Sequence, residues 1–185
     1  MSNILRTDRI SLISLDVSNL EHVLNDKIYQ FRDIDERLSN PDYILKDNKY
    51  LVNLRLNQLK SNRRLADWLL YLVVDNQKHT IVGNVGFHDK PDKDGMIEFG
   101  ITIGKSFRKQ GYAFEAISTL CSWAIKTGEV RSIRASVSPD NVASKALISK
   151  LGLIKIGKQI DDIDGLEYVF QIPIDVFPTI AFVAN

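Results

Sequence analysis

The sequence predicts an α/β fold: a mixed, mostly antiparallel sheet of about six or seven strands with about four flanking helices. Three consecutive runs with strand character, residues 69–74, 80–87 and 96–103, are joined by short polar turns, which is typical of an antiparallel meander. The apolar period then changes from two to 3.6 over residues 113–124, which indicates a helix. A strand pattern at residues 132–137 follows this helix, so a crossover to a parallel strand is expected.

The N-terminal part begins with a strand near residues 9–15, in which Ile10 and Leu12 alternate with polar positions. Ser18 and Glu21 have the spacing of a capping box, which predicts a short helix running to about Tyr29 or Phe31. Residues 32–49 are polar and irregular. A second helix is expected over residues 50–61, and its inward positions are Leu51, Val52, Leu56 and Leu59.

The C-terminal part holds a helix over residues 142–151, which Gly152 ends. Its expected buried positions are Ala143, Ala146, Leu147 and Leu151. Residues 153–158 and 166–172 are the last two expected strands. The tail from Val176 to Val183 is unusually apolar, so it should dock either on the core or on a second subunit in a homodimer.

Bulk properties fit one domain spanning residues 1–185. The chain is 44% hydrophobic and 25% charged with a net charge of +1, so no broad nucleic-acid-binding surface is expected. The single Cys121 lies on the apolar stripe of a helix, which favours core packing and a reducing compartment. No apolar run is long enough for a membrane span and the N-terminus has no signal core, so the expected location is cytoplasmic.

The most informative stretch is the turn between the strand at 96–103 and the helix that follows it. It reads Arg108, Lys109, Gln110, Gly111, Tyr112, Ala113. A helix N-terminus presents unpaired N–H groups and partial positive charge, and a glycine lets an anion approach the backbone closely. With two cations beside it, this turn is predicted to bind a diphosphate.

Two other kinds of diphosphate site fit less well. Gly104, Lys105 and Ser106 match the end of a P-loop, but that motif needs a glycine where Phe99 stands. A P-loop would support a nucleotide phosphohydrolase. The sequence also has no G-x-G-x-x-G run of the dinucleotide-binding type.

Arg108, Gly111 and Ala113 fit the acetyl-CoA motif Q/R-x-x-G-x-G/A. Downstream, Asn141-x-x-Ser144 is followed by Lys150-Leu151-Gly152-Leu153, close to an N-x-x-S motif with a K-L-G-F-like end, and the opening Leu5-x-Thr7-x-Arg9-Ile10-x-Leu12 also fits. On these residues the chain resembles the GNAT superfamily of N-acetyltransferases, most closely the branch that acetylates ribosomal-protein N-termini. The resemblance covers about residues 6–15 and 67–174.

The resemblance implies a sheet that splays between its fourth and fifth strands and a cosubstrate, acetyl-CoA, with no metal. It places the cofactor on the backbone of Ile101, Thr102 and Ile103, on the turn, and on Asn141 and Ser144. The turn residues concerned are Arg108, Lys109, Gln110, Gly111, Tyr112 and Ala113. Residues 32–64 would wall the acceptor site.

Amine acetylation also needs groups that move protons. Glu98, mid-strand among apolar residues, is the candidate base, acting through water if burial raises its pKa, but it also fits an ordinary solvated carboxylate. Ser144 is the candidate acid for the leaving thiolate, because Ile148 stands where much of the superfamily has a tyrosine. Ser144 equally fits a first-turn residue whose hydroxyl bonds locally to the helix backbone. Asn141 equally fits a helix N-cap, or it could serve both as N-cap and as cofactor contact.

The function this implies is transfer of an acetyl group from acetyl-CoA to a primary amine by direct attack. The acceptor is either a protein N-terminus or a small amine such as a polyamine or an antibiotic-like molecule. The alternative is a non-catalytic acyl-CoA-binding or partner-binding module on the same fold. His22, His79 and His88 lack metal-ligand spacing, Trp68 and Trp123 fit packing, and Tyr168 fits the core better than the acceptor site.

Overall fold

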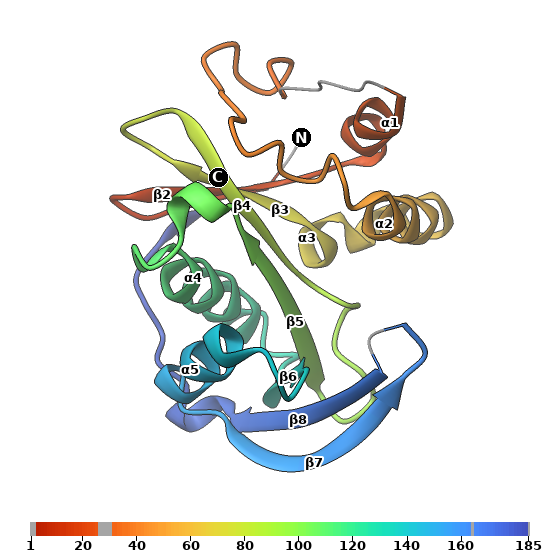
Figure 1. Ribbon diagram of the computed structural model, residues 1–185, viewed down its shortest axis with the longest axis vertical. Coiled ribbons are helices and arrows are strands. Elements are labelled where there is room, and N and C mark those ends of the chain that lie inside the picture. Colours follow the sequence, from red (N-terminus) through yellow and green to blue (C-terminus); the bar gives the residue numbers. More distant parts are fainter. Residues whose placement is uncertain (1–2, 26–30, 164, 185) are drawn as a thin grey trace.

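The computed structural model describes residues 3–25, 31–163 and 165–184. They form one nine-stranded sheet with helices on both faces, in the strand order β7-β8-β6-β5-β4-β3-β2-β1-β9 (Figure 1). The α/β class and the antiparallel meander β3-β4-β5 are confirmed. The two extra strands, β1 and β9, are three and two residues long and pair with each other at the sheet edge.

The strands are β1 (Ile4–Arg6), β2 (Ile10–Ser14), β3 (Tyr71–Asp75), β4 (Thr80–Phe87), β5 (Met96–Ile103), β6 (Ser132–Val137), β7 (Ile154–Asp161), β8 (Gly165–Pro173) and β9 (Val183–Ala184). The α-helices are α1 (Val17–Asn25), α2 (Lys49–Ser61), α3 (Ala66–Leu69), α4 (Tyr112–Lys126) and α5 (Val142–Lys150). Short 3-10 turns lie at Arg63–Leu65, Lys105–Phe107 and Ile174–Val176. Within the described ranges, no helix is long and apolar enough to cross a membrane.

The sheet divides between β5 and β6, which are the one parallel pair among the described strands. Their register covers only Met96–Glu98 against Ser132–Arg134, whereas β5 continues to Ile103 and β6 to Val137. The carboxyl ends of these two strands therefore separate, as the family resemblance implies, and α4 and α5 follow from those ends. In open α/β sheets, ligands bind where parallel strands diverge in this way.

Two apolar clusters lie on opposite faces of the sheet. The larger packs α4 and α5 against one face, with Phe87, Ile97, Leu120 and Ile133 among its buried members. The second packs α1, α2 and the segment 31–45 against the other face over β1, β2, β3 and β4, and it includes no residue of β5. The face of β5 that carries Glu98 is therefore left outside both clusters.

The start of α1 differs from the expected capping box. Asp16, not Ser18, caps the helix: its Oδ1 accepts the Asn19 N–H at 3.0 Å, while Asn19 Oδ1 accepts the Asp16 N–H at 3.1 Å. Aspartate and asparagine are preferred at this position because their short side chains reach the first free N–H groups. The expected end of this helix, near Tyr29 or Phe31, falls partly on residues outside the described ranges.

The buried stripe of α5 also differs from the expected one. Ala143 and Ala146 are exposed, whereas Ile148 and Leu151 are buried. Burial of an isoleucine removes more apolar area from water than burial of an alanine, so the larger side chains decide which face of the helix packs.

The apolar tail docks on the chain's own core. Phe177 is buried, Phe182 packs on the larger cluster, and β9 adds to the edge strand β1. The Lys126 ammonium lies 4.1 Å from the centre of the Phe182 ring, and the Ile180 N–H donates to Ser122 Oγ at 2.9 Å. Docking on the core is confirmed, and a homodimer stays a prediction.

Candidate active site

The turn that precedes α4 is shaped by two residues with positive φ. Gly111 has a φ of 83° and forms the N-terminal boundary of α4, and Lys109 has a φ of 59°. No side chain caps the first turn of α4 at Gly111, so the free N–H groups expected at a helix N-terminus have no side-chain acceptor there. This end of the helix can receive an anion.

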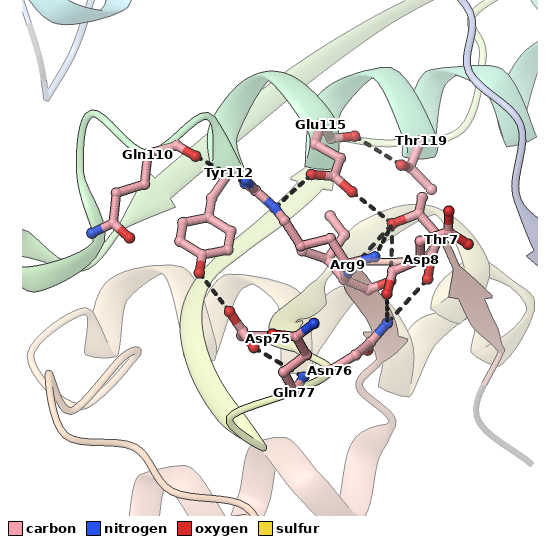
Figure 2. Close-up of polar contacts among 11 residues, drawn as sticks. Thr7, Asp8, Arg9, Asp75, Asn76, Gln77, Gln110, Tyr112, Glu115 and Thr119 are labelled. Atoms are coloured by element: carbon pink, nitrogen blue, oxygen red, sulfur yellow. Dashed lines mark hydrogen bonds and ion pairs between the residues drawn. The ribbon is translucent and has the colours of Figure 1, made fainter.

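A cation from the N-terminal hairpin supports this turn from behind (Figure 2). Arg9 Nη2 donates to the Gln110 carbonyl at 3.0 Å, and Arg9 Nε lies 2.9 Å from Glu115 Oε2. Thr7 Oγ1 donates to the other oxygen of Glu115 at 2.6 Å. The Arg9 guanidinium also lies over the Tyr112 ring, 4.3 Å from its centre. Arg9 therefore contacts both neighbours of Gly111 in the chain, Gln110 and Tyr112.

Tyr112 extends this support to the β3–β4 turn. Its side chain is buried and its hydroxyl donates to Asp75 (Figure 2). Burial, together with this bond, raises the pKa of Tyr112 to about 12. Burial disfavours ionised Asp75, but hydrogen bonds from Tyr112 and from the Lys78 and Gln77 backbone outweigh it and lower its pKa. The Tyr112 side chain is therefore structural, and only its backbone can contact a ligand at the turn.

The edge of β5 toward β6 is open beyond Glu98. His88 N–H donates to the Glu98 carbonyl and Gly104 N–H donates to the Val82 carbonyl, so even-numbered β5 residues direct their backbone groups to β4. By alternation, the backbone groups of Ile101 and Ile103 face the open side. Arg108 Nε donates to the Ile103 carbonyl at 3.2 Å, so the cation of the turn already reaches this edge.

Thr102 takes a different place from its neighbours. Its backbone pairs with Asn84 on β4, and its side chain lines an open cavity of about 650 Å³. Asn84 is 5% exposed, also lines this cavity, and its side chain has no hydrogen bond to the described residues. The remaining lining residues are Asp42, Tyr43, Ile44, Leu45, Asp47, Asn48, Ile103, Gly104, Lys105, Ser106 and Arg108.

Glu98, Gly100 and Thr102 lie on the same face of β5, because side chains two residues apart on a strand point the same way. It is half-buried, and within the described ranges its carboxylate has no hydrogen bond or ion pair. Arg134 is the register partner of Glu98 on β6, and the Nε of Arg134 is buried without a hydrogen-bond partner among the residues that the structure describes. Both side chains are thus available to a ligand on this face.

Asn141 and Ser144 begin α5 on the other side of the divergence. Asn141 Oδ1 accepts the Ser144 N–H at 3.0 Å, which makes Asn141 the N-cap of α5. This leaves the amide nitrogen of Asn141 for a ligand, so capping and cofactor binding are compatible. Ser144 is half-buried, and its hydroxyl makes no hydrogen bond with the described residues.

Residues 32–64, which were predicted to wall the acceptor site, are hydrogen-bonded to the loop after β5. Asp42 accepts two hydrogen bonds from Ser106, one from the backbone N–H at 2.9 Å and one from Oγ at 2.8 Å. A Cβ at Gly104 would lie 2.5 Å from Asp42 Oδ2, so this contact needs a glycine. The Lys105–Phe107 turn is a 3-10 turn, and α4 begins only at Tyr112, which excludes the P-loop arrangement.

Several side chains that were predicted to have a packing role rather than a role in catalysis or ligand binding are found in packed positions. Trp68 and Trp123 pack edge to face with ring centres 4.9 Å apart, and Cys121 is buried, which raises the pKa of its thiol. Tyr168 is the register partner of Val137, so its side chain lies on the Val137 face of the sheet, opposite to the Glu98 face, where it is half-buried. Among the residues described, no group of three His, Cys, Asp or Glu side chains could hold a metal ion.

Sequence reasoning missed Arg9, Asp42 and Asp75. Their partners are 101, 64 and 37 residues away, so no local pattern could show them. Thr7 and Arg9 do belong to the opening pattern that resembles the acetyltransferases, and both hold Glu115.

The comparison with known protein families decides the identity. Residues 21–154 match the model of the acetyltransferase (GNAT) domain, which is more than half of the chain. The chain belongs to the GNAT acetyltransferase family. This GNAT enzyme transfers an acetyl group from acetyl-CoA to an amine, and its relatives are N-acetyltransferases.

An uncharacterised N-acetyltransferase of Bacillus subtilis (strain 168), YjdG, is 28% identical over 151 residues, which are 82% of this chain and 89% of that protein. A Salmonella typhimurium acetyltransferase that modifies the N-terminal serine of the 50S ribosomal protein L7/L12 has a TM-score of 0.65 at 14% identity, covering 91% of this chain and 97% of that one. The microcin C7 self-immunity acetyltransferase MccE, in complex with acetyl-CoA and AMP, has a TM-score of 0.63 at 16% identity, covering 91% and 94%. At these identities the structural matches support the GNAT fold.

Proposed function

We propose that acetyl-CoA binds with its pyrophosphate on the backbone of residues 108–113 and its pantetheine arm along the open edge of β5. The support is the coincidence of two features at the strand divergence: a helix start with free N–H groups, and an unpaired strand edge leading away from it. Ile101 and Ile103 would pair with the arm, and Arg108 and Lys109 would neutralise the phosphates. Asn141 and Ser144 would contact the arm from α5.

The acceptor amine would approach on the Glu98 face of β5. An ammonium has no lone pair, so it must lose a proton before attack, and a half-buried carboxylate can promote this, directly or through water. The amine then forms a C–N bond with the thioester carbon and coenzyme A leaves as a thiolate. Open-edge N–H groups of β5 are suitable donors to the oxyanion, and Ser144 is the candidate to protonate the sulfur.

The acceptor class is proposed as a primary amine on a protein N-terminus or a small molecule. The cavity beside Asn84 and Thr102 would hold the body of the acceptor, and its volume of about 650 Å³ lies in the range of small-molecule sites. The Asp42–Ser106 contact joins the cofactor loop to the wall of this cavity. A cytoplasmic location and the absence of nucleic-acid or membrane partners stay predictions.

A thiol-release assay tests this function. Acetyl-CoA is mixed with the protein and either spermidine or a short peptide with an N-terminal serine, and free coenzyme A is measured over time. We expect release that depends on the amine. Binding of acetyl-CoA without release in the presence of either amine, and of a wider panel of primary amines, would contradict the proposal and favour a binding module.

A further inference from the structure

His88 lies beside Glu98 at the start of the open face of β5. Its N–H donates to the Glu98 carbonyl at 2.8 Å, so the two residues are direct neighbours on adjacent strands. Its own carbonyl accepts from Arg55 Nη1 at 2.7 Å and from Gln58 Nε2 at 3.0 Å, which fixes its backbone against α2. The position of this residue is therefore set by two separate elements, β5 and α2.

The imidazole of His88 leans across β5 onto the catalytic face. A Cβ built on Gly100 would lie 3.5 Å from His88 Nε2 and 4.0 Å from its Cδ2. Gly100 is two residues from Glu98, so its Cβ direction is that of the Glu98 side chain. The ring thus lies against the position that a side chain at residue 100 would take, on the face of β5 that carries Glu98.

The charges around this ring keep it suited to proton exchange. Partial desolvation lowers the pKa of His88, the positive charge of Arg55 lowers it further, and Glu98 opposes this shift, as do Glu167 on β8 and Asp161 on β7. The imidazole is therefore mainly neutral near pH 7. Because the residue is still exposed to solvent, its ring can pass a proton to water.

We propose that His88 is the second member of a proton relay: it receives the proton that Glu98 draws from the acceptor ammonium and releases it to solvent. The inference rests on the proposed function, because it assumes that the amine meets acetyl-CoA on this face. It assigns a role to a histidine that the spacing of histidines in the sequence did not single out.

One turnover releases one proton to solvent. The acceptor R–NH3⁺ gives one proton to Glu98 or its bound water, and this proton moves to neutral imidazole, leaving R–NH2 and an imidazolium. The amine lone pair forms the C–N bond, the C–S bond breaks with its electrons on sulfur, and the second amine proton goes to the thiolate. The imidazolium then returns its proton to water, so the products are the amide, coenzyme A thiol and one solvent proton.

The relay predicts a specific kinetic pattern for His88→Gln. We expect kcat to fall about 100-fold, within the usual range for loss of a proton-transfer group, with little change in acetyl-CoA affinity. The limb of the kcat/KM profile that reports this histidine, at a pH below the ordinary value of 6.5, should disappear. In His88→Ala, added imidazole should restore part of the rate. The matched control is His79→Gln in the β3–β4 turn, which should leave the rate unchanged.

A second measurement does not depend on turnover. Nuclear magnetic resonance titration of the ring should show a lower pKa for His88 in Glu98→Gln than in the unmodified protein, because the carboxylate that favours the imidazolium is gone.

Turnover with an unchanged rate and pH profile in His88→Gln would overturn the relay and leave the proposed function intact. An unchanged pKa of His88 in Glu98→Gln would overturn the relay as well. Absence of turnover by the unmodified protein with every amine would instead contradict the proposed function itself.

Discussion

The two ends of β5 differ in whether the polar side chains around them have partners within the protein. At the carboxyl end, the turn before α4 is held by Arg9, Tyr112 and Glu115, and the polar groups of these three supporting side chains have hydrogen-bond or ion-pair partners in the chain. Near the start of β5, Glu98 and the Nε of Arg134 have none within the described ranges. The difference suggests that the turn is pre-shaped for one constant ligand, acetyl-CoA, while the Glu98 face gains its partners from the acceptor.

The largest effect is expected from breaking the Glu98 face. Glu98→Gln keeps the shape of the side chain but removes its basicity, so kcat should fall about 100- to 10,000-fold. Acetyl-CoA affinity, measured by titration calorimetry, should stay the same, because the turn is untouched. Glu129→Gln in the loop before β6 is the control and should retain full activity. An unchanged rate in Glu98→Gln would remove the base assignment.

The next effect comes from breaking the turn. A β-branched residue at positive φ is strained by about 1–3 kcal/mol, so Gly111→Val should disturb the turn and weaken acetyl-CoA binding about 10- to 100-fold. Gly128→Val is a matched control, since Gly128 has a φ of 79° and an added Cβ there meets no atom within 4 Å. Both variants should lose stability, but only the change at 111 should affect acetyl-CoA. Equal affinity in the two would contradict the assignment.

A smaller effect is expected from the support behind the turn. Tyr112→Phe removes the one side-chain hydrogen bond to Asp75 Oδ2 seen among the described residues and should lower the free energy of unfolding by about 1–2 kcal/mol. Because the folded-state pKa of Tyr112 is raised to about 12, the stabilisation is complete below pH 10 and is lost as the pH rises toward 12. Denaturation with urea between pH 8 and 12 should show the two proteins converging. A difference that does not decline with pH would contradict this role.

The smallest effect concerns the link between the two regions. Asp42→Ala removes both hydrogen bonds to Ser106, and each is worth about 0.5–1.5 kcal/mol at most in a partly exposed contact. The KM for the acceptor should rise about threefold, with kcat nearly unchanged. Asp47→Ala, which lines the same cavity without bonding Ser106, should change KM less. Equal effects in both variants would show that the link has no role.

Local patterns in the sequence were enough to predict the elements around this site. The change of period from β5 to α4 fixed both elements, and the position of Gly111 fixed the turn between them. Patterns within a few residues do not decide which face of α5 packs, because Ile148 joins an apolar cluster whose other members come mainly from α4 and distant strands. The prediction that Ala143 and Ala146 lie inward was wrong for that reason.

The support of the site was the part that the sequence did not reveal. Arg9 reaches Gln110, Asp42 reaches Ser106 and His88 reaches the space above Gly100 only after the strands have paired. Each contact joins residues whose separation in the chain carries no periodic signal. The capping of α1 has a different cause: it is local, but the pair Asp16 and Asn19 has the same three-residue spacing as the pair Ser18 and Glu21, so spacing alone does not choose between them.

The most direct test of this account is a crystal structure of the protein with coenzyme A. We expect the pyrophosphate on the backbone N–H groups of residues 108–113 and the pantetheine arm along Ile101 and Ile103, with the sulfur on the side of β5 that Glu98 and His88 border. Phosphates bound elsewhere, for example in the cavity beside Asn84, would contradict it.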